Sequence, residues 1–567
     1  MHQTPPDKAE RRGLELFTPK LVTILREGYS FGTFRHDSVA ALTVAIVALP
    51  LAMAIGIASG ATPEKGLITA IVAGFLISAL GGSRFQIGGP TAAFIVVVFQ
   101  TIDRHGYDGL LMAMAIAGVI LIVLGALRLG TFIKYIPYPV ITGFTAGIAV
   151  SIFASQLKDL LGLDATLPAD FIPKIGVIYE ALPSINVMAV GTAVLALAII
   201  IGLKMARPKW PGFLIAVIAC SALTALADLD IATIGSAFGG VPRTLPVPEL
   251  PTFDLSRVGA ILPDAMTIAF LAGIESLLSA VVADGMTGRR HRSNSELVAQ
   301  GFANLGSVLF GGLPATGAIA RTATNIRAGG RTPVSGMLHA IILLVFVLVA
   351  APLLSYIPLA ALAAILAFVA WNIAEFDHIR AILTGATTGD RFVLLITFLL
   401  TVLVDLTVAI EVGVVLAALL FMHRMANAVE IETEAHLIEE DVPDSTPRSG
   451  ETFDAARNHR RSVVYRINGP FFFGATQKFS SVLDSIGDAP DVYILDLSGV
   501  PFVDSTAAAA LKSFVRHAQG QGAGIVLASA TPRVRHMLRD FGIGHPDVRF
   551  SPDVSSAMAS SDAGSPG

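Results

Sequence analysis

Residues 313–325 read LPATGAIARTATN, and residues 83–94 read SRFQIGGPTAAF. Both stretches lie between strongly apolar segments, yet each mixes Gly, Pro and Thr, and the first also contains Arg321. A continuous helix would be weak there. Irregular backbone at membrane depth persists only where protein or water satisfies its polar groups. The simplest structure for each stretch is an extended segment that leads into a half-helix.

Two such half-helices that meet head to head would direct their N-terminal N–H groups at one point near the middle of a membrane. The positive ends of their dipoles would face the same point, so that it would bind an anion. The alternative interpretation is a pair of ordinary helices kinked at glycine.

The composition around these stretches is that of an integral membrane protein. Of the 567 residues, 53% are hydrophobic and 14% are charged, and the mean hydropathy is +0.70. Soluble domains carry about 25% charged residues. Cys220 is the single cysteine, which excludes an intramolecular disulfide and a Cys-based metal site. No basic stripe or recognition motif supports nucleic-acid binding.

Apolar stretches of spanning length alternate with short loops from residue 38 to about residue 428. A spanning helix needs roughly 20 residues, or fewer where it is broken. Fourteen candidate spans lie near 38–58, 63–80, 85–101, 109–128, 135–160, 184–203, 211–227, 263–284, 294–311, 315–328, 334–354, 357–373, 391–406 and 407–424. The last two are hard to separate from each other.

An even number of spans places both termini on one side of the membrane. Lys and Arg gather in the loops on that side, for example at Arg289, Arg290 and Arg292, and the opposite loops hold fewer of them. By the positive-inside rule both termini are therefore expected to be cytoplasmic. The chain is expected to be a multi-pass protein of the inner (plasma) membrane, in contact with its lipid.

The two halves of the apolar region echo each other. Tyr-Ile-Pro at 135–137 opens the fifth span, and Tyr-Ile-Pro at 356–358 opens the twelfth. A Gly-Gly pair precedes the unusual stretch in both the third and the tenth span. Because seven spans are an odd number, two such halves must insert with opposite orientations, as in the inverted repeats of secondary transporters.

The character of the sequence changes near residue 430. Residues 429–461 are rich in acid, Pro, Arg and His. After them, SVVYRI (462–467), DVYILDLS (491–498) and GIVLAS (524–529) are typical of strands. Helices are expected between these strands, at 475–486 and 506–518. Strands that alternate with helices indicate a small soluble α/β domain.

Several motifs resemble the sulfate permease (SulP) family of anion transporters. They are ALPLAMAIGIASG (48–60), IPYPVITGFTAG (136–147), AFLAGIESLLSAVVADGMTG (269–288), GGLPATGAIARTATNIRAGGRTP (311–333) and IPLAALAAIL (357–366). The stretch LDLSGVPFVDSTA (495–507) resembles part of a STAS domain, the sulfate transporter and anti-sigma factor antagonist module.

The resemblance implies a polytopic α-helical fold of 14 spans in a 7+7 inverted repeat, shared with uracil transporters, followed by a small soluble α/β STAS domain. It implies a core (spans one to four and eight to eleven) that moves, elevator-like, against a gate (spans five to seven and twelve to fourteen), in a homodimer. The expected domains are a cytoplasmic N-terminal arm (1–37), a transmembrane transport domain (38–428), a linker (429–461), the STAS domain (462–558) and a tail (559–567).

The resemblance also implies where the substrate binds. The backbone N–H groups of Thr91 and Ala92, at the start of the third-span half-helix, are expected to face the anion. Ala320 and Arg321 are expected to do so from the tenth span, because a charged residue within a span is usually functional. An Arg held in a purely structural ion pair is the alternative.

Apolar and coupling residues complete the expected site. Met53 and Ile55 of the first span would line an apolar wall, with ordinary helix packing as the alternative. Glu275 matches the family's acidic position, and Ser279 lies one turn later on the same face. Together they could hold Na⁺, or Glu275 could carry a proton. A structural pair of Glu275 with Arg321 is the third interpretation.

In the STAS stretch, Ser505 follows Asp504 at the place where relatives of this module are phosphorylated. Phosphate at a helix N-terminus would be favoured by the helix dipole. The alternative is an unmodified serine that caps the helix. A cytoplasmic protein partner is expected to bind here if the domain signals.

The sequence therefore predicts a secondary transporter of a small anion of the bicarbonate, sulfate or C4-dicarboxylate class, working by H⁺ or Na⁺ symport or by anion exchange. Two alternatives stay open: a nucleobase-type carrier on the same fold, and a non-transporting anion sensor that signals through the STAS domain. No enzyme constellation, metal site or cofactor is expected, and no Walker A sequence is present to couple ATP directly.

Overall fold

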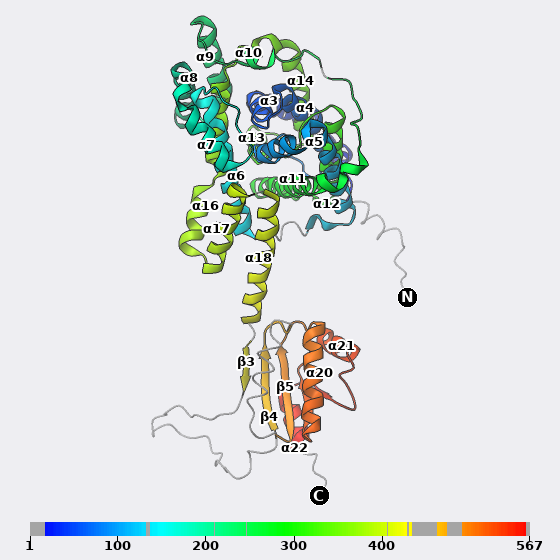
Figure 1. Ribbon diagram of the computed structural model, residues 1–567. Helices are drawn as coiled ribbons and strands as arrows, with labels where there is room; N and C mark the ends of the chain where they lie inside the picture. Colours follow the sequence, from blue (N-terminus) through cyan, green and yellow to red (C-terminus); the bar gives the residue numbers. More distant parts are fainter. Residues whose placement is uncertain are drawn as a thin grey trace, which may run out of the picture. The chain divides into compact units, whose positions relative to one another are not determined.

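The chain divides into two compact units, Met1–Val415 and Leu416–Gly567. The computed structural model describes residues 17–131, 137–208, 210–244, 246–404, 406–427, 430–433, 462–472 and 490–562 (Figure 1). The first unit is built from helices, and the second contains a five-stranded sheet.

The first half of the helical unit follows the predicted order of spans. Its elements are α2 (Lys20–Glu27), α3 (Phe31–Ala58), α4 (Pro63–Leu80), β1 (Gly88–Gly89), α5 (Phe94–Ala126), α6 (Tyr138–Leu161), α7 (Phe171–Ala181), α8 (Val187–Ala206), α9 (Gly212–Leu226) and α10 (Ile234–Phe238). Gly106, with φ of 73°, interrupts α5 and divides it into the third and fourth spans.

The second half repeats the arrangement. Its elements are α11 (Val258–Thr287), α12 (Ser293–Leu309), β2 (Thr316–Gly317), α13 (Ile319–Arg327), α14 (Val334–Leu354), α15 (Leu359–Ile373), α16 (Phe376–Gly385), α17 (Thr388–Leu403) and α18 (Leu406–Asn427). The thirteenth and fourteenth spans, which the sequence hardly separates, are thus distinct helices.

Nine helices in the described part of the chain are long and apolar enough to cross a membrane. This number is smaller than the fourteen spans for two reasons. The kinked α5 contains two spans. The helices α9, α12, α13 and α17 have 15, 17, 9 and 16 residues, which is short for a span.

The helices pack as two groups, which we name the core group (α3, α4, α5, α11, α12, α13 and α14) and the gate group (α6, α7, α8, α9, α15, α16, α17 and α18). Within the core group, α12 packs on α5 and α4, and α14 packs on α3 and α4. Within the gate group, α6 packs on α15 and α17, and α8 on α9. Figure 1 shows α7, α8 and α9 on one side of α3, α4 and α5. This is the division that the family resemblance implies.

The two unusual stretches are extended segments that lead into half-helices, as predicted. They pair with each other as β1 and β2, in antiparallel register with Gly88 opposite Gly317 and Gly89 opposite Thr316. At Gly89, φ is +149° and a Cβ would lie 2.4 Å from Arg321 Nη1. Only glycine fits such a position. The alternative of two ordinary Gly-kinked helices is wrong.

Part of the predicted N-terminal arm is helical. It contains α2 and the first turns of α3, which Ser30 caps by accepting a hydrogen bond from the N–H of Thr33 at 3.2 Å. Asp37 is fully buried and accepts hydrogen bonds from the N–H groups of Arg331 and Thr332, at 2.7 and 3.2 Å. The polar residues before Ser38 did not indicate the start of α3. The carboxylate of Asp37 is buried there because it accepts hydrogen bonds from a loop almost 300 residues away.

The C-terminal unit is an α/β domain. Its sheet has the order β3 (Glu430–Thr433), β4 (Ser462–Asn468), β5 (Val492–Gly499), β6 (Gly524–Ala528) and β7 (Arg549–Ser551), and all neighbours are parallel except β3 and β4. The helices are α20 (Ser505–Gly520), α21 (Pro532–Asp540) and α22 (Val554–Asp562).

This unit confirms the three predicted strands and the helix at 506–518. The helix predicted at 475–486 lies outside the described residues. The first residues of the predicted linker form the edge strand β3, which its alternating Glu and β-branched residues did not reveal. Helix α22 runs to Asp562 and so enters the predicted tail.

Candidate functional site

Both half-helices begin beside the β1–β2 pairing, so their N-terminal ends meet in the middle of the core group. In α13 the N–H groups of Ile319, Ala320 and Arg321 have no acceptor within the helix. The first intrahelical bond runs from the N–H of Thr322 to the carbonyl of Ala318. In α5 a tight turn precedes the helix, in which the N–H of Phe94 bonds to the carbonyl of Thr91 at 3.2 Å. Two sets of helix-start donors therefore lie at one joint, as an anion site requires.

Arg321 lies directly at this joint. Its side chain is buried, with 2% of the residue exposed, and Nη2 donates to the carbonyl of Pro90 at 3.2 Å. Its Nε and Nη1 have no hydrogen-bond partner among the described residues. A guanidinium carries five donors in a planar fork that suits a carboxylate or another oxyanion. Arg321 therefore has donors to offer to a bound anion.

Glu275 reaches the same joint from α11. Its Oε2 accepts a hydrogen bond from the hydroxyl of Thr91 at 2.9 Å, although 184 residues separate them in the sequence. Within the described part of the chain no ion pair joins Glu275 to Arg321. The carboxylate and the guanidinium thus contact neighbouring residues of the third-span stretch, Thr91 and Pro90, and not each other.

Ser279 is engaged elsewhere. It is fully buried, and its hydroxyl bonds to Thr322 Oγ1 at 3.1 Å. That oxygen also accepts the N–H of Ile87 at 3.1 Å. Ser279 therefore connects α11, α13 and the third-span stretch. Among the described residues, no group of three or more His, Cys, Asp or Glu side chains could hold a metal ion.

The remaining predicted contact residues differ in accessibility. Ala320 is exposed, Thr91 is partly exposed, and Ala92 is buried in the turn before α5. Met53 and Ile55 are 0% and 2% exposed and belong to the central hydrophobic cluster. Burial of this kind fits helix packing as well as an apolar wall, so the role of these two residues stays a prediction.

A fully buried carboxylate, Glu296 in the first turn of α12, supports the site and was not predicted from the sequence. Its Oε2 accepts the N–H groups of Gly82 and Ser83 at 2.8 and 3.1 Å. Its Oε1 accepts from Gln300 at 2.9 Å and from Ser276 at 3.2 Å. The signal available in the sequence is a lone acidic residue inside an apolar span.

These bonds hold the start of the extended stretch against α11 and α12. Gln86 Nε2 donates to Ser276 Oγ at 2.6 Å, and Asn325 Nδ2 donates to the carbonyl of Phe85 at 2.9 Å. The half-helices are therefore positioned by side chains from both halves of the chain.

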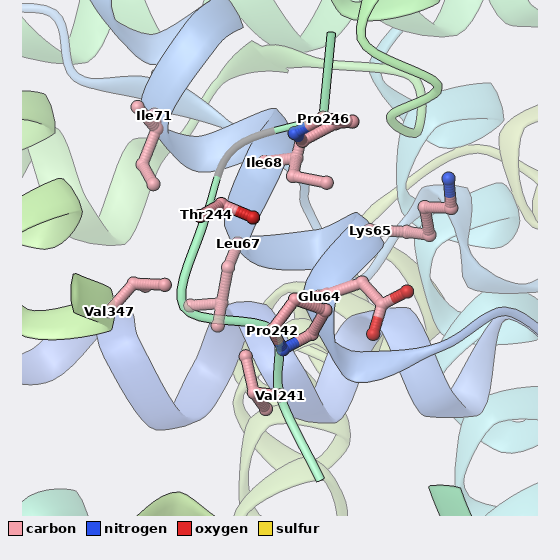
Figure 2. Close-up of a pocket in the computed structure, with 10 residues that line it drawn as sticks. All are labelled: Glu64, Lys65, Leu67, Ile68, Ile71, Val241, Pro242, Thr244, Pro246 and Val347. Carbon is pink, nitrogen blue, oxygen red and sulfur yellow. The ribbon is translucent and has the colours of Figure 1, made fainter. Parts of the chain in front are cut away.

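A cavity of about 160 Å³ lies at the start of α4, apart from this joint (Figure 2). Glu64, Lys65 and Leu67 line it together with Pro242 and Val347. None of the predicted site residues belongs to its lining.

In the C-terminal unit, Ser505 is exposed and is the first residue of α20. The capping residue is Asp504, whose Oδ1 accepts the N–H of Ala507 at 2.8 Å. The serine hydroxyl is therefore not the cap, and the modification of Ser505 stays a prediction.

Comparison with known proteins identifies the family. The model of the sulfate permease family matches residues 34–397, and that of the STAS domain matches residues 454–557. YvdB of Bacillus subtilis, provisionally named a sulfate transporter, is 40% identical over 92% of this chain and 96% of its own length. The bicarbonate transporter BicA of Picosynechococcus is 32% identical over 90% of this chain and 91% of its own.

Solved structures share the fold. The transmembrane domain of a cyanobacterial bicarbonate transporter BicA is 30% identical, with a TM-score of 0.60 over 69% of this chain and 98% of that one. The murine Solute Carrier 26 member A9 anion transporter, in its inward-facing state, is 19% identical, with a TM-score of 0.85 over 99% of this chain and 96% of that one. From its motifs, its paired half-helices and these matches, the chain belongs to the sulfate permease family of multi-pass membrane anion transporters and carries a STAS domain.

Proposed function

We propose that this protein is a secondary transporter that binds one small oxyanion at the joint of the two half-helices. The observation that carries the proposal is Arg321, a buried guanidinium whose Nε and Nη1 have no partner among the described residues and which lies beside two helix starts. A buried charge is costly unless it is paired. An anion at the joint would supply the missing counter-charge.

The substrate class is bicarbonate, sulfate or a C4-dicarboxylate. Relatives named as sulfate and bicarbonate transporters cover nearly the whole chain, which supports the two inorganic anions first. A nucleobase carrier on this fold is less well supported, because a neutral base needs no guanidinium at its site. The proposed role of the residues is direct contact by Arg321 and by the N–H groups of Ala320 and Ala92.

We further propose that Glu275 couples transport to protons. A carboxylate in an apolar bundle needs a proton, a cation or a counter-charge. The hydroxyl of Ser279, the other suggested Na⁺ ligand, already bonds to Thr322. In that bond the Ser279 oxygen is the donor and keeps its lone pairs, so the preference for H⁺ rests on the carboxylate of Glu275, and Na⁺ symport and simple anion exchange are the remaining modes.

The proposed cellular setting rests on the charge distribution for the side of the termini and on the family resemblance for the homodimer and the motion. Both termini lie in the cytoplasm, the membrane is the inner (plasma) membrane, and the protein works as a homodimer. The core group moves against the gate group, elevator-like, so that the joint faces each side in turn. In this setting the STAS domain is available to a cytoplasmic protein partner.

Uptake into proteoliposomes tests the proposal. Labelled bicarbonate, sulfate, succinate, chloride and uracil are each offered with an inward proton gradient, with an inward Na⁺ gradient, and with neither. Accumulation of one anion driven by protons is the expected result. Uptake of uracil alone would establish the nucleobase carrier. Anion binding without any flux would establish the sensor.

A further inference from the structure

Lys174, on the short helix α7, is a buried cation that the proposed mechanism leaves unused. Only 4% of the residue is exposed, although lysine is rarely buried without a carboxylate partner. Its contacts come from two different groups of helices.

The ammonium connects the gate group to the core group. Nζ donates to the hydroxyl of Ser155 on α6 at 2.9 Å. The same Nζ lies 5.7 Å from the centre of the Phe99 ring on α5, within the range of a cation–π interaction. The ring of Phe99 in turn packs against Gly60, where a Cβ would lie 3.0 Å from Phe99 Cδ2. Lys174 thus holds the far end of the third-span half-helix.

The charge of Lys174 is only weakly compensated. Among the described residues no carboxylate lies within ion-pair distance of Nζ. Burial lowers the pKa of Lys174, and Asp170, one turn earlier on the chain, acts in the opposite direction. One hydroxyl and one aromatic face replace the water that an ammonium prefers.

Lys174 lies beside the part of the third-span half-helix that points away from the joint. Phe99 follows Phe94, the first residue of α5, by five residues, a rise of about 7.5 Å along the helix. Because five spans precede α7, Lys174 lies on the membrane side opposite to the start of α3.

We propose that Lys174 is a second anion-contact residue, located at the mouth of the pathway on the side opposite the N-terminus. In the present conformation Ser155 and Phe99 hold its ammonium, and this contact closes that mouth. When the core group moves, Phe99 leaves the ammonium, which then receives the anion that enters from that side. The inference rests on the proposed anion transport.

Sided kinetics in proteoliposomes test this role. Vesicles are sorted by the accessibility of an N-terminal affinity tag, and the anion's KM is measured for entry from the tag side and from the opposite side. We expect K174Q to raise KM about five- to tenfold for entry from the opposite side and to leave the tag-side KM unchanged. K174R, which keeps the charge, is expected to restore most of the affinity.

Lys158, a lysine of the same helix group with no contact to Phe99, provides the matched control as K158Q. Unchanged KM values on both sides in K174Q, or equal changes on both sides, would overturn the role of Lys174 while leaving anion transport intact. Absence of any anion flux in the wild type would instead overturn the proposed function. A monodisperse elution profile of K174Q and transport by K174R exclude a folding defect.

Discussion

Arg321 is the residue on which the candidate site depends most. Arg321→Ala removes a buried guanidinium beside two helix starts, and a charge-assisted hydrogen bond is worth about 1.5–3 kcal/mol. We therefore expect the anion's dissociation constant to rise at least tenfold, measured by titration calorimetry or by the KM of uptake. Arg321→Lys should recover part of the affinity, because it keeps the charge without the planar fork.

Arg327 offers a matched control for this substitution. It lies on the same helix, α13, and its side chain is exposed. Arg327→Ala should leave the affinity within twofold of the wild type. Equal affinity in the Arg321→Ala and Arg327→Ala variants would remove Arg321 from the site.

Glu275 is the second residue whose proposed role can be tested, and its test concerns the coupling of transport to protons. Glu275→Gln mimics the protonated carboxyl and can still accept the hydrogen bond from Thr91. We expect the variant to bind and exchange the anion but to lose accumulation driven by an inward proton gradient. The measurement is labelled-anion uptake with and without that gradient, and Glu375→Gln, an exposed gate-group residue, is the control. Strict Na⁺ dependence in the wild type would contradict proton coupling.

Sequence alone could single out Arg321 and Glu275 as candidates, from their charge within apolar stretches and from the family resemblance. It could not determine what they contact. Ser279 lies one turn from Glu275, yet its hydroxyl bonds to Thr322. Glu296 carried the same signal, a lone acid in an apolar span, but its backbone partners, Gly82 and Ser83, lie more than 200 residues away and could not be inferred. Such contacts depend on the packing of the two halves.

At the scale of elements, the β1–β2 pairing holds the starts of the two half-helices together. A substitution at Gly317 tests this role. A Cβ at this position would lie 1.7 Å from Gln86 Nε2, which itself bonds to Ser276. Overpacking of this kind costs about 1–3 kcal/mol. Gly317→Ala should lower the melting temperature and the transport rate together, as measured by thermal unfolding in detergent and by uptake.

The control for this element is Gly259→Ala in the first turn of α11. A Cβ there meets no atom within 4 Å. Alanine is also the better helix former, so this variant should be as stable as the wild type or slightly more so. A Gly317→Ala variant with wild-type stability would mean that the pairing tolerates a shift.

The elements themselves were predictable to different degrees. Gly, Pro and Thr within apolar stretches indicated the half-helices. These residues weaken a continuous helix, although a position within the membrane requires every backbone polar group to be bonded. The strand β3 could not be predicted in this way. Its four residues alternate with acids, as in a linker, and form a strand because they pair with β4. The break at Gly106 falls in the predicted gap between the third span (85–101) and the fourth (109–128), and only its positive φ is visible in the backbone alone.

At the scale of the whole molecule, the chain contains two compact units, and their separation can be tested. Truncation after Met425 removes the sheet and its helices but keeps the unit Met1–Val415. We expect the shortened protein to fold, because its core is contained within that unit, and to show impaired transport or assembly. Light scattering after size exclusion and uptake assays measure these outcomes. Full-rate transport with an unchanged oligomeric state would contradict the expectation.

The hydrogen-bonded crossing of β1 and β2 has a consequence for the energetics of the cycle. The two helix starts that provide donors come from opposite halves of the chain, but they are fastened to each other. Because the two half-helices are bonded to each other, the site moves as one unit. It therefore keeps its hydrogen-bond donors when it faces either side of the membrane. The half-helix donors should then contribute the same affinity facing either solution, so any difference in affinity between the two sides must come from residues outside the joint, such as Lys174. Net direction would belong entirely to the concentration and voltage differences across the membrane, and reversing them should reverse the flux through the same binding site.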